Sequence, residues 1–294
     1  MQLSLKKQPK FYLGLVLPAI LIVSSLILYP LLNGVYMSFT DASPLYQDTN
    51  WVGFENYTYL LSDNGFWEVV WNTVFMVGAS IILSTFLAYV LATALNTGLK
   101  AAPLLRTLIF QIWVLPWIVI AILWAWLFSE NFGLVNYVAI SLGIIDEPYK
   151  WLFDPQGSQW AVIAGYVWRS LPLLMVIILA ALQGVPDELE EAAKIDGTNF
   201  IQRQYLVVFP LVKNIVVVAM LLQSVRLFQE ITLIFVLTKG GPINATMVLS
   251  LFTYKLAFED WDFGLAAAVS MLWLVLIMFL ALFLMKTVIR SNTE

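Results

Sequence analysis

Long apolar stretches alternate with short polar segments along the whole chain, and this pattern predicts helices that cross a membrane. A helix needs about 20 residues to cross a hydrocarbon layer of about 30 Å. The stretches that meet this length are 11–32, 69–95, 104–128, 160–182, 211–237 and 265–285. The predicted fold is therefore an all-α membrane protein with six transmembrane helices, forming a single domain over residues 1–294. The first stretch has no convincing small-residue cleavage site, so we interpret it as an anchor that is retained.

Basic residues indicate the orientation, because translocation disfavours positive charge on the far side of a membrane. With six spans both termini lie on one side, together with the segments near 96–104 and 183–210. Those four segments and their flanks contain ten basic residues: Lys6, Lys7, Lys10, Lys100, Arg106, Lys194, Arg203, Lys213, Lys286 and Arg290. The opposite loops contain three: Lys150, Lys239 and Lys255. We therefore expect both termini to be cytoplasmic.

The composition supports a membrane protein and excludes much catalytic chemistry. The chain is 61% hydrophobic and 12% charged, whereas about 25% of the residues in a soluble domain are charged. It contains neither cysteine nor histidine, so it has no thiolate or imidazole metal site and no Ser-His or Cys-His nucleophile pair. Its net charge of −4 gives no sign of nucleic-acid binding. We expect a protein that is not itself an enzyme.

A charged insert, residues 184–210, separates the fourth and fifth predicted spans. Pro186 suits the first position of a helix, where its missing N–H is not needed. Three acidic residues follow near the positive end of the helix dipole: Asp187, Glu188 and Glu190. Gly197 suits the helix end, and a second helix is predicted to begin at Thr198 or Asn199 and to run toward a kink at Pro210. The insert is thus predicted to be helix, turn, helix on the cytoplasmic side.

One face of the first predicted helix suits a close contact with another protein. Leu189, Ala192 and Ala193 share that face at helical spacing, and the two alanines leave room for an approaching backbone. Charged side chains flank the face: Glu188, Glu191 and Lys194. The alternative is a solvated amphipathic helix that has no partner.

The insert resembles the EAA signature found in the permease subunits of bacterial ABC importers. The matching residues are Glu191-Ala192-Ala193, Asp196-Gly197 and Phe209-Pro210. The sequence departs from that signature at Phe209, which replaces the usual Leu, and at Asn214, where Pro is common. The resemblance implies that the insert forms coupling helices that dock on an ATPase subunit. It assigns this role to Glu188, Glu191, Ala192, Ala193, Asp196 and Gly197.

Further motifs resemble the carbohydrate-importer group of these permeases, which includes maltose, glycerol-phosphate and raffinose systems. They are Tyr29-Pro30, Ser38-Phe39-Thr40, 52–57, Asn72-Thr73, 168–172, 238–246, 254–258 and 263–268. Each motif is short, but they occur in the right order relative to the predicted spans. The turn at 238–246 also has a physical interpretation, because Gly240-Gly241-Pro242 favours a tight non-helical connection. We expect this turn to be mainly structural.

Ionisable residues inside predicted spans cost at least about 2.5 kcal/mol each near the bilayer centre, so they are expected to face a cavity or a partner. Arg169, Arg226 and Glu230 are such residues, and Gln223 and Gln229 add amide groups. Arg226 and Glu230 lie four residues apart, so we expect them to share a helix face with Gln223. These five side chains are candidates for the substrate pathway. The alternative for the Arg226–Glu230 pair is an ion pair that fixes helix packing.

Tryptophans in the third predicted span offer a second way to contact a sugar. Trp113, Trp117 and Trp124 are at helical spacing, and Trp126 is close by. Stacking on a sugar ring is one interpretation. The alternative is that they pack helices together or lie in the aromatic belt of the membrane interface.

The chain lacks the G-x-x-x-x-G-K-[ST] phosphate loop, so ATP and Mg²⁺ are expected on a partner subunit. The resemblance implies a heterodimer with a second related permease subunit, two ATPase subunits and an extracytoplasmic solute-binding protein in a bacterial plasma membrane. The expected substrate is a sugar or an oligosaccharide, and a non-sugar solute is the alternative. An ion-coupled transporter would need more membrane-embedded carboxylates than Glu230. A membrane enzyme would need a paired acid and base or a metal cluster.

Overall fold

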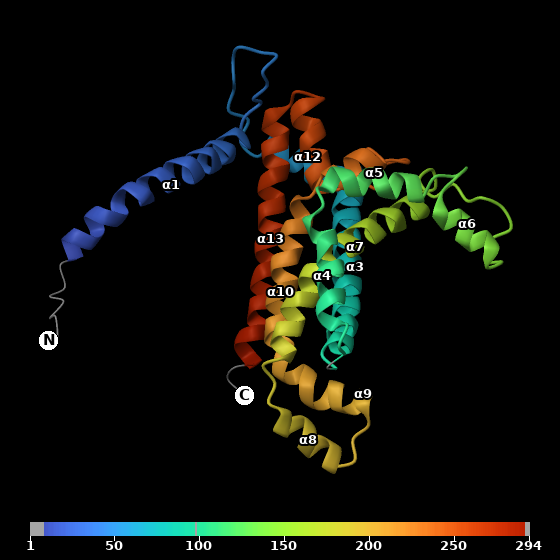
Figure 1. Ribbon diagram of the computed structural model, residues 1–294. Coiled ribbons are helices and arrows are strands. Elements are labelled where there is room, and N and C mark those ends of the chain that lie inside the picture. The colour runs from blue at the N-terminus through green and yellow to red at the C-terminus, as the bar shows by residue number, and fades with distance from the viewer. Residues whose placement is uncertain (1–8, 98, 292–294) are drawn as a thin grey trace. The chain divides into compact units, whose positions relative to one another are not determined.

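The computed structural model describes residues 9–97 and 99–291, and helices dominate it (Figure 1). The helices are α1 (Pro9–Met37), α2 (Glu55–Ser62), α3 (Asn64–Leu95), α4 (Ala102–Val114), α5 (Trp117–Leu127), α6 (Leu134–Ser141), α7 (Pro155–Leu182), α8 (Asp187–Ile195), α9 (Phe200–Arg203), the π turn η1 (Gln204–Val208), α10 (Phe209–Gln229), α11 (Thr232–Leu237), α12 (Leu249–Phe258) and α13 (Phe263–Ser291). The prediction of an all-α membrane fold is confirmed.

Five helical segments in the described residues are long and apolar enough to cross a membrane. They are Val16–Met37, Asn64–Leu95, Pro155–Leu182, Phe200–Gln229 and Phe263–Phe283. A bent pair of helices, α4 and α5, makes a sixth candidate if the two are counted together. The expected number of six spans therefore agrees with the structure only when that pair is one broken span.

The span predicted over 104–128 is broken into two helices in the structure. α4 ends at Val114, α5 begins at Trp117, and the two helices are inclined by 99°. Leu115 and Pro116 between them have extended backbones, with ψ of 135° and 143°. Proline explains the break, because it cannot donate a helical hydrogen bond and it pushes the preceding residue out of the helical region.

The prediction of one span over 211–237 is wrong at both ends. Helical residues run without interruption from Phe200 to Gln229, so this span starts within the charged insert. It stops at Glu230, whose ψ of 124° is extended. The Glu230 carboxylate accepts a hydrogen bond from the Thr232 N–H at 2.7 Å, so this side chain favours the start of a new, short helix, α11, over continuation of α10.

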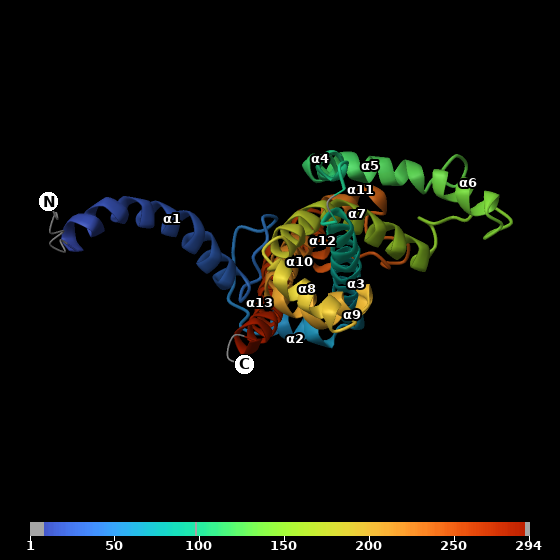
Figure 2. The ribbon, with the colours of Figure 1, turned by 60° about the horizontal axis from the view of Figure 1, so that its bottom comes forward.

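The chain divides into two compact units, 1–63 with 253–272 and 64–252 with 273–294. In the second unit, α3, α4, α7 and α10 pack side by side (Figures 1 and 2). Small residues on α3 let neighbouring helices approach closely, as is usual within membranes. The buried cluster that joins these helices contains Ala88, Ala92, Leu95, Ala102, Leu174, Met175, Ile178, Leu179, Leu182, Val208, Val212, Val216 and Ala219.

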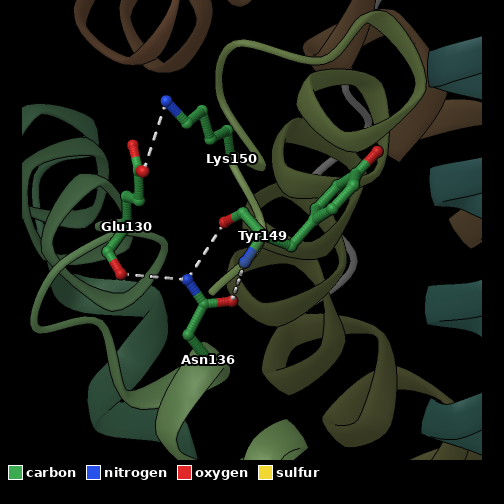
Figure 3. A network of polar contacts seen from close by, with 4 residues as sticks. All are labelled: Glu130, Asn136, Tyr149 and Lys150. Atoms are coloured by element: carbon green, nitrogen blue, oxygen red, sulfur yellow. Dashed lines mark hydrogen bonds and ion pairs between the residues drawn. The ribbon is translucent and has the colours of Figure 1, made fainter. Parts of the chain in front are cut away.

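A polar loop, residues 128–154, connects α5 through α6 to the start of α7, and Asn136 organises it (Figure 3). The buried Asn136 amide donates to the carbonyls of Glu130 and Tyr149, and its oxygen accepts from the Tyr149 N–H and from Trp151 Nε1. Lys150 Nζ lies 3.4 Å from Glu130 Oε1. Every hydrogen-bonding group of the Asn136 side chain is thus used within the loop.

Asp154 begins α7 at the end of this loop. Its carboxylate accepts the Gly157 N–H at 2.7 Å, as expected of a helix N-cap. This hydrogen bond, and a second one from the Tyr149 hydroxyl, hold the pKa of Asp154 below its ordinary value. The start of α7 is therefore fixed by local hydrogen bonds rather than by its apolar residues.

The turn predicted at Gly240-Gly241-Pro242 is tight and non-helical, as expected. α11 ends at Leu237, and four residues have positive φ: Lys239, Gly240, Ile243 and Asn244. The Thr238 and Thr246 hydroxyls lie 2.6 Å apart across the turn. A Cβ on Gly240 would lie 2.6 Å from the Met247 side chain. These internal contacts agree with a mainly structural role.

Candidate functional site

The charged insert forms the helix, turn and helix that the sequence predicts, at the end of the second unit where α7 ends and α10 begins (Figure 1). α8 begins one residue later than expected, so Pro186 is its N-cap and not its first residue. Gly197 has a φ of +80°, and the N–H groups of Gly197 and Thr198 bond back to Lys194 and Ala193. Gly197 therefore ends α8 in the left-handed conformation that glycine favours.

Asn199 starts the second helix of the insert, as predicted. Its side chain accepts the Gln202 N–H at 2.9 Å, and the Gln202 side chain accepts the Asn199 N–H at 3.0 Å. This reciprocal pair is a capping box, and it satisfies two donors at the helix start. The two helices are also joined by an ion pair, because Arg203 Nε lies 3.5 Å from Glu190 Oε2.

The two alanines of the insert point in different directions. Ala193 is buried against its own chain, whereas Ala192 is exposed. The prediction of one outward face containing both alanines is therefore wrong, because Ala193 is used to pack α8 on the following turn. The exposed residues with a predicted coupling role are Glu188, Glu191, Ala192, Asp196 and Gly197.

Ile195 is an outward residue that the sequence interpretation missed. Its side chain is 85% exposed, and it shares a stripe of α8 with Glu188 and Ala192 at spacings of four and three. Ile201 at the start of α9 is 76% exposed. The spacing from Glu188 could have identified Ile195 in advance. The outward face of the insert is thus apolar and small at its centre, with carboxylates beside it.

Gln223 lies between two helices, not on an open surface. It is buried, and its amide nitrogen donates to the Ser170 hydroxyl of α7 at 2.6 Å. Because each group satisfies the other, this hydrogen bond holds α10 on α7. Its proposed contact with a substrate remains a prediction.

We expect Gln223→Met to lower the stability of the folded protein by about 1 to 3 kcal/mol, because Met keeps the volume but leaves the buried Ser170 hydroxyl without this partner. Gln229→Met is the matched control, since Gln229 is exposed and makes no side-chain hydrogen bond within the described residues. The thermal midpoint of the purified protein measures the difference. Equal midpoints for the two variants would contradict a packing role for Gln223.

Arg226 and Glu230 do not share a helix face as predicted. α10 ends at Gln229, so Glu230 lies beyond the helix in extended backbone. Within residues 9–97 and 99–291 no ion pair joins them. Arg226 and Gln229 are exposed on α10, and Glu230 is partly buried. The structure therefore does not make them a polar stripe on one helix.

Arg169 of α7 lies beneath two tryptophan rings. Its guanidinium carbon is 5.4 Å from the ring centroid of Trp113 in α4 and 5.1 Å from that of Trp117 in α5. Both contacts are within the range of a cation–π interaction. The Nε atom of Arg169 is buried and has no hydrogen-bond partner in the described part of the chain.

The tryptophans of the third predicted span therefore do not form one helical face, because the bend separates Trp113 from the others. Trp124 packs edge-on against Trp168, with ring centroids 6.0 Å apart, and Trp126 is exposed.

Tyr166 belongs to the same cluster, although no motif or spacing in the sequence indicates this. Its ring meets Trp117 edge-on, and its hydroxyl donates to the Glu230 carbonyl at 3.3 Å. The structure thus brings together a guanidinium and aromatic rings at the break between α4 and α5, and Tyr166 joins them to the backbone of Glu230 at the end of α10. We call Trp113, Trp117, Tyr166, Arg169 and Glu230 the aromatic–arginine cluster.

Comparison with known proteins gives a family match and full-length relatives. The family described as "binding-protein-dependent transport system inner membrane component" matches residues 84–291. The trehalose/maltose transport system permease protein MalF of Thermococcus litoralis is 31% identical over 264 residues, which is 90% of this chain and 88% of MalF. The sulfoquinovosyl glycerol transport system permease protein SmoG of Agrobacterium fabrum is 31% identical over 87% of this chain and 84% of SmoG.

A solved structure shares the fold. It is a chain in the crystal structure of a bacterial ABC transporter involved in the import of the acidic polysaccharide alginate, with a TM-score of 0.81. The sequence identity is 20%, and the similarity covers 97% of this chain and 96% of that one.

Proposed function

Because the chain belongs to the family of binding-protein-dependent transport system inner membrane components, we propose that it is one permease half of an ATP-driven sugar importer. The observation that carries this proposal is the charged insert, a compact pair of helices with an exposed apolar stripe and adjacent carboxylates. Such a stripe is suited to a protein partner, because an exposed Ile195 has no packing role in its own chain.

The proposed partners are those that the resemblance to ABC importer permeases implies. The chain has no phosphate loop, so ATP and Mg²⁺ bind to two separate ATPase subunits, which dock on the insert. A second related permease subunit completes the pathway, and an extracytoplasmic solute-binding protein delivers the substrate. The protein lies in the bacterial plasma membrane with both termini in the cytoplasm, in agreement with the distribution of Lys and Arg.

The proposed substrate is a sugar or an oligosaccharide. Two relatives of nearly the same length are named for carbohydrate substrates, trehalose/maltose and sulfoquinovosyl glycerol. The aromatic–arginine cluster has the chemistry that such a substrate requires, since tryptophan rings stack on sugar rings and a guanidinium donates to hydroxyl groups. Arg226 and Gln229 of α10 are exposed and offer further hydrogen-bond donors to such a substrate.

Transport proceeds by alternating access. When ATP closes the pair of ATPase subunits, the docked inserts of the two permease halves are drawn together, and the spans open toward the loaded binding protein. Hydrolysis reverses the motion, and the sugar leaves to the cytoplasm. The capping box and the Glu190–Arg203 ion pair make the insert a firm unit that can transmit this motion.

Glu191→Lys tests this function. We expect it to reduce co-purification of the ATPase subunits about tenfold or more, because it reverses an exposed charge beside the proposed docking stripe. Glu147→Lys, the same change in the polar loop 128–154, is the control, and this variant should retain the ATPase subunits. The ratio of ATPase to permease in the purified complex is the measurement. Failure of the wild-type chain to co-purify any ATPase, or full retention by Glu191→Lys, would contradict the proposal.

A further inference from the structure

The helical run from Phe200 to Gln229 changes its winding once, at the π turn Gln204–Val208. The Phe209 N–H bonds to the Gln204 carbonyl, five residues back instead of four. Pro210 gives the physical reason, because it has no N–H and its ring would clash with the carbonyl of Leu206 in a regular α-helix. The π turn accommodates the proline without breaking the helix. It is therefore the joint between the charged insert and α10.

α3 contacts this joint through Tyr89. The Tyr89 hydroxyl donates to Gln204 Oε1 at 3.2 Å, and its ring meets Phe209 edge-on with centroids 5.7 Å apart. Gln204 is the first residue of the π turn and Phe209 is the first residue after it. One side chain of α3 thus bridges both ends of the turn. Val208 of the turn belongs to the buried cluster, and Tyr89 packs against that cluster.

α8 of the insert is joined to the start of the same π turn by an ion pair. Arg203 directly precedes the π turn, and it pairs with Glu190 of α8 while its guanidinium lies 5.7 Å from the ring centroid of Phe200. A displacement of α8 is therefore passed to Arg203 and then to Gln204. From Gln204 it has two routes, along the backbone into α10 and through Tyr89 into α3.

We propose that Tyr89 is a positioning residue for coupling, which makes α3 move together with the insert when an ATPase subunit displaces it. The proposal rests on the proposed function. The Tyr89 hydroxyl is the group that links α3 to the π turn, because it bonds to Gln204 within the turn. The Tyr89 ring contacts only Phe209, which follows the turn. π turns occur often at functional sites. In this chain, a displacement of the insert would pass from the π turn into both α10 and α3.

The test measures distances between pairs of spin labels in the complex with its ATPase subunits in lipid nanodiscs. The chain has no cysteine, so pairs are introduced at exposed positions: Lys194→Cys with Val90→Cys, and Lys194→Cys with Tyr137→Cys. The first pair measures the distance from the insert to α3. The second pair measures the distance from the insert to α6 in the polar loop 128–154. Each is measured without nucleotide and after trapping with Mg-ATP and orthovanadate.

In the wild-type background we expect trapping to change the Lys194–Tyr137 distance and to leave the Lys194–Val90 distance unchanged. In Tyr89→Phe we expect the Lys194–Val90 distance to change as well. The ratio of molecules with the original Lys194–Val90 distance to molecules with the changed distance should fall about two- to tenfold. This is the effect expected from the loss of one neutral hydrogen bond. Gln204→Met should have the same effect, and the double variant should add little to it.

Thr85→Val is the matched control. Thr85 lies one turn before Tyr89 on α3, and its buried hydroxyl has no hydrogen-bond partner in the described residues, so this variant should behave as wild type. An unchanged Lys194–Val90 distance in Tyr89→Phe would overturn the inference, and so would a change of that distance in wild type. If no ATPase subunit binds, or trapping changes neither wild-type distance, the proposed function fails and the inference fails with it.

Discussion

Gly197→Val is expected to lower sugar uptake about tenfold or more while the protein still reaches the membrane. Gly197 has a φ of +80°, and a left-handed backbone costs an ordinary residue about 1–2 kcal/mol, with a larger cost for a β-branched one. Nothing lies within 4 Å of a Cβ added at this position. The effect therefore comes from the backbone alone, which would change the angle between α8 and α9. Uptake and ATP hydrolysis in proteoliposomes measure it.

Gly197→Asn separates the effect of the left-handed backbone at residue 197 from any other effect of adding a side chain there. Asn tolerates the left-handed region better than other non-glycine residues, so uptake by this variant should stay well above that of Gly197→Val. ATP hydrolysis should persist in both variants. Equal uptake by Gly197→Val and wild type would show that the geometry of the turn does not transmit motion.

The insert was largely predictable because its signals are local. Gly197 has a conformational role that its residue type suggests, and Asn199 is one of the two N-cap residues that the sequence predicts. The direction of Ala193 was not predictable in the same way, since it depends on which face of α8 the following turn covers. A pattern of four and three places Ala192 and Ala193 on neighbouring faces and does not say which of them packs inward.

The broken spans show what apolar composition leaves out. The residues 104–128 are apolar enough to cross a membrane, but Pro116 divides them into two helices at 99°. Glu230 ends α10 by bonding to the Thr232 N–H, and this competition between side chain and backbone does not affect the hydrophobic pattern. In both places the residue that ends the helix can be read from the sequence, but its backbone conformation cannot.

The aromatic–arginine cluster depends on those two breaks. Trp113 and Trp117 reach Arg169 from two helices that the sequence pattern treats as one, and Tyr166 reaches Glu230 because its carbonyl is free of α10. The sequence therefore indicates that Arg169 and Glu230 are unusual residues within predicted spans, but it does not indicate their partners. Gln223 differs, since its partner Ser170 lies within the 168–172 motif, but that motif does not indicate the hydrogen bond between them.

Among the described glycines of the first unit, Gly264 leaves the least room for a side chain. It is the second residue of α13, and its N–H donates to the Ala42 carbonyl at 2.9 Å. A Cβ on Gly264 would lie 2.1 Å from the Thr40 carbonyl oxygen and 3.1 Å from the Ala42 nitrogen. Both atoms belong to backbone, which cannot move aside as a flexible side chain would.

Gly264→Ala is therefore expected to reduce the amount of folded protein severely, by about 3 kcal/mol or more, because overpacking and the loss of a hydrogen bond act together. Gly78→Ala is the control, since α3 has nothing within 4 Å of a Cβ at that position, and alanine favours a helix over glycine. The yield of monodisperse protein and its thermal midpoint measure both variants. The segment 38–42 is held in place by the Asn56 amide, which donates to the Ser38 and Thr40 carbonyls, so α13 would have to move instead. A midpoint for Gly264→Ala equal to that of Gly78→Ala would mean that the start of α13 does not pack on Thr40 in the membrane.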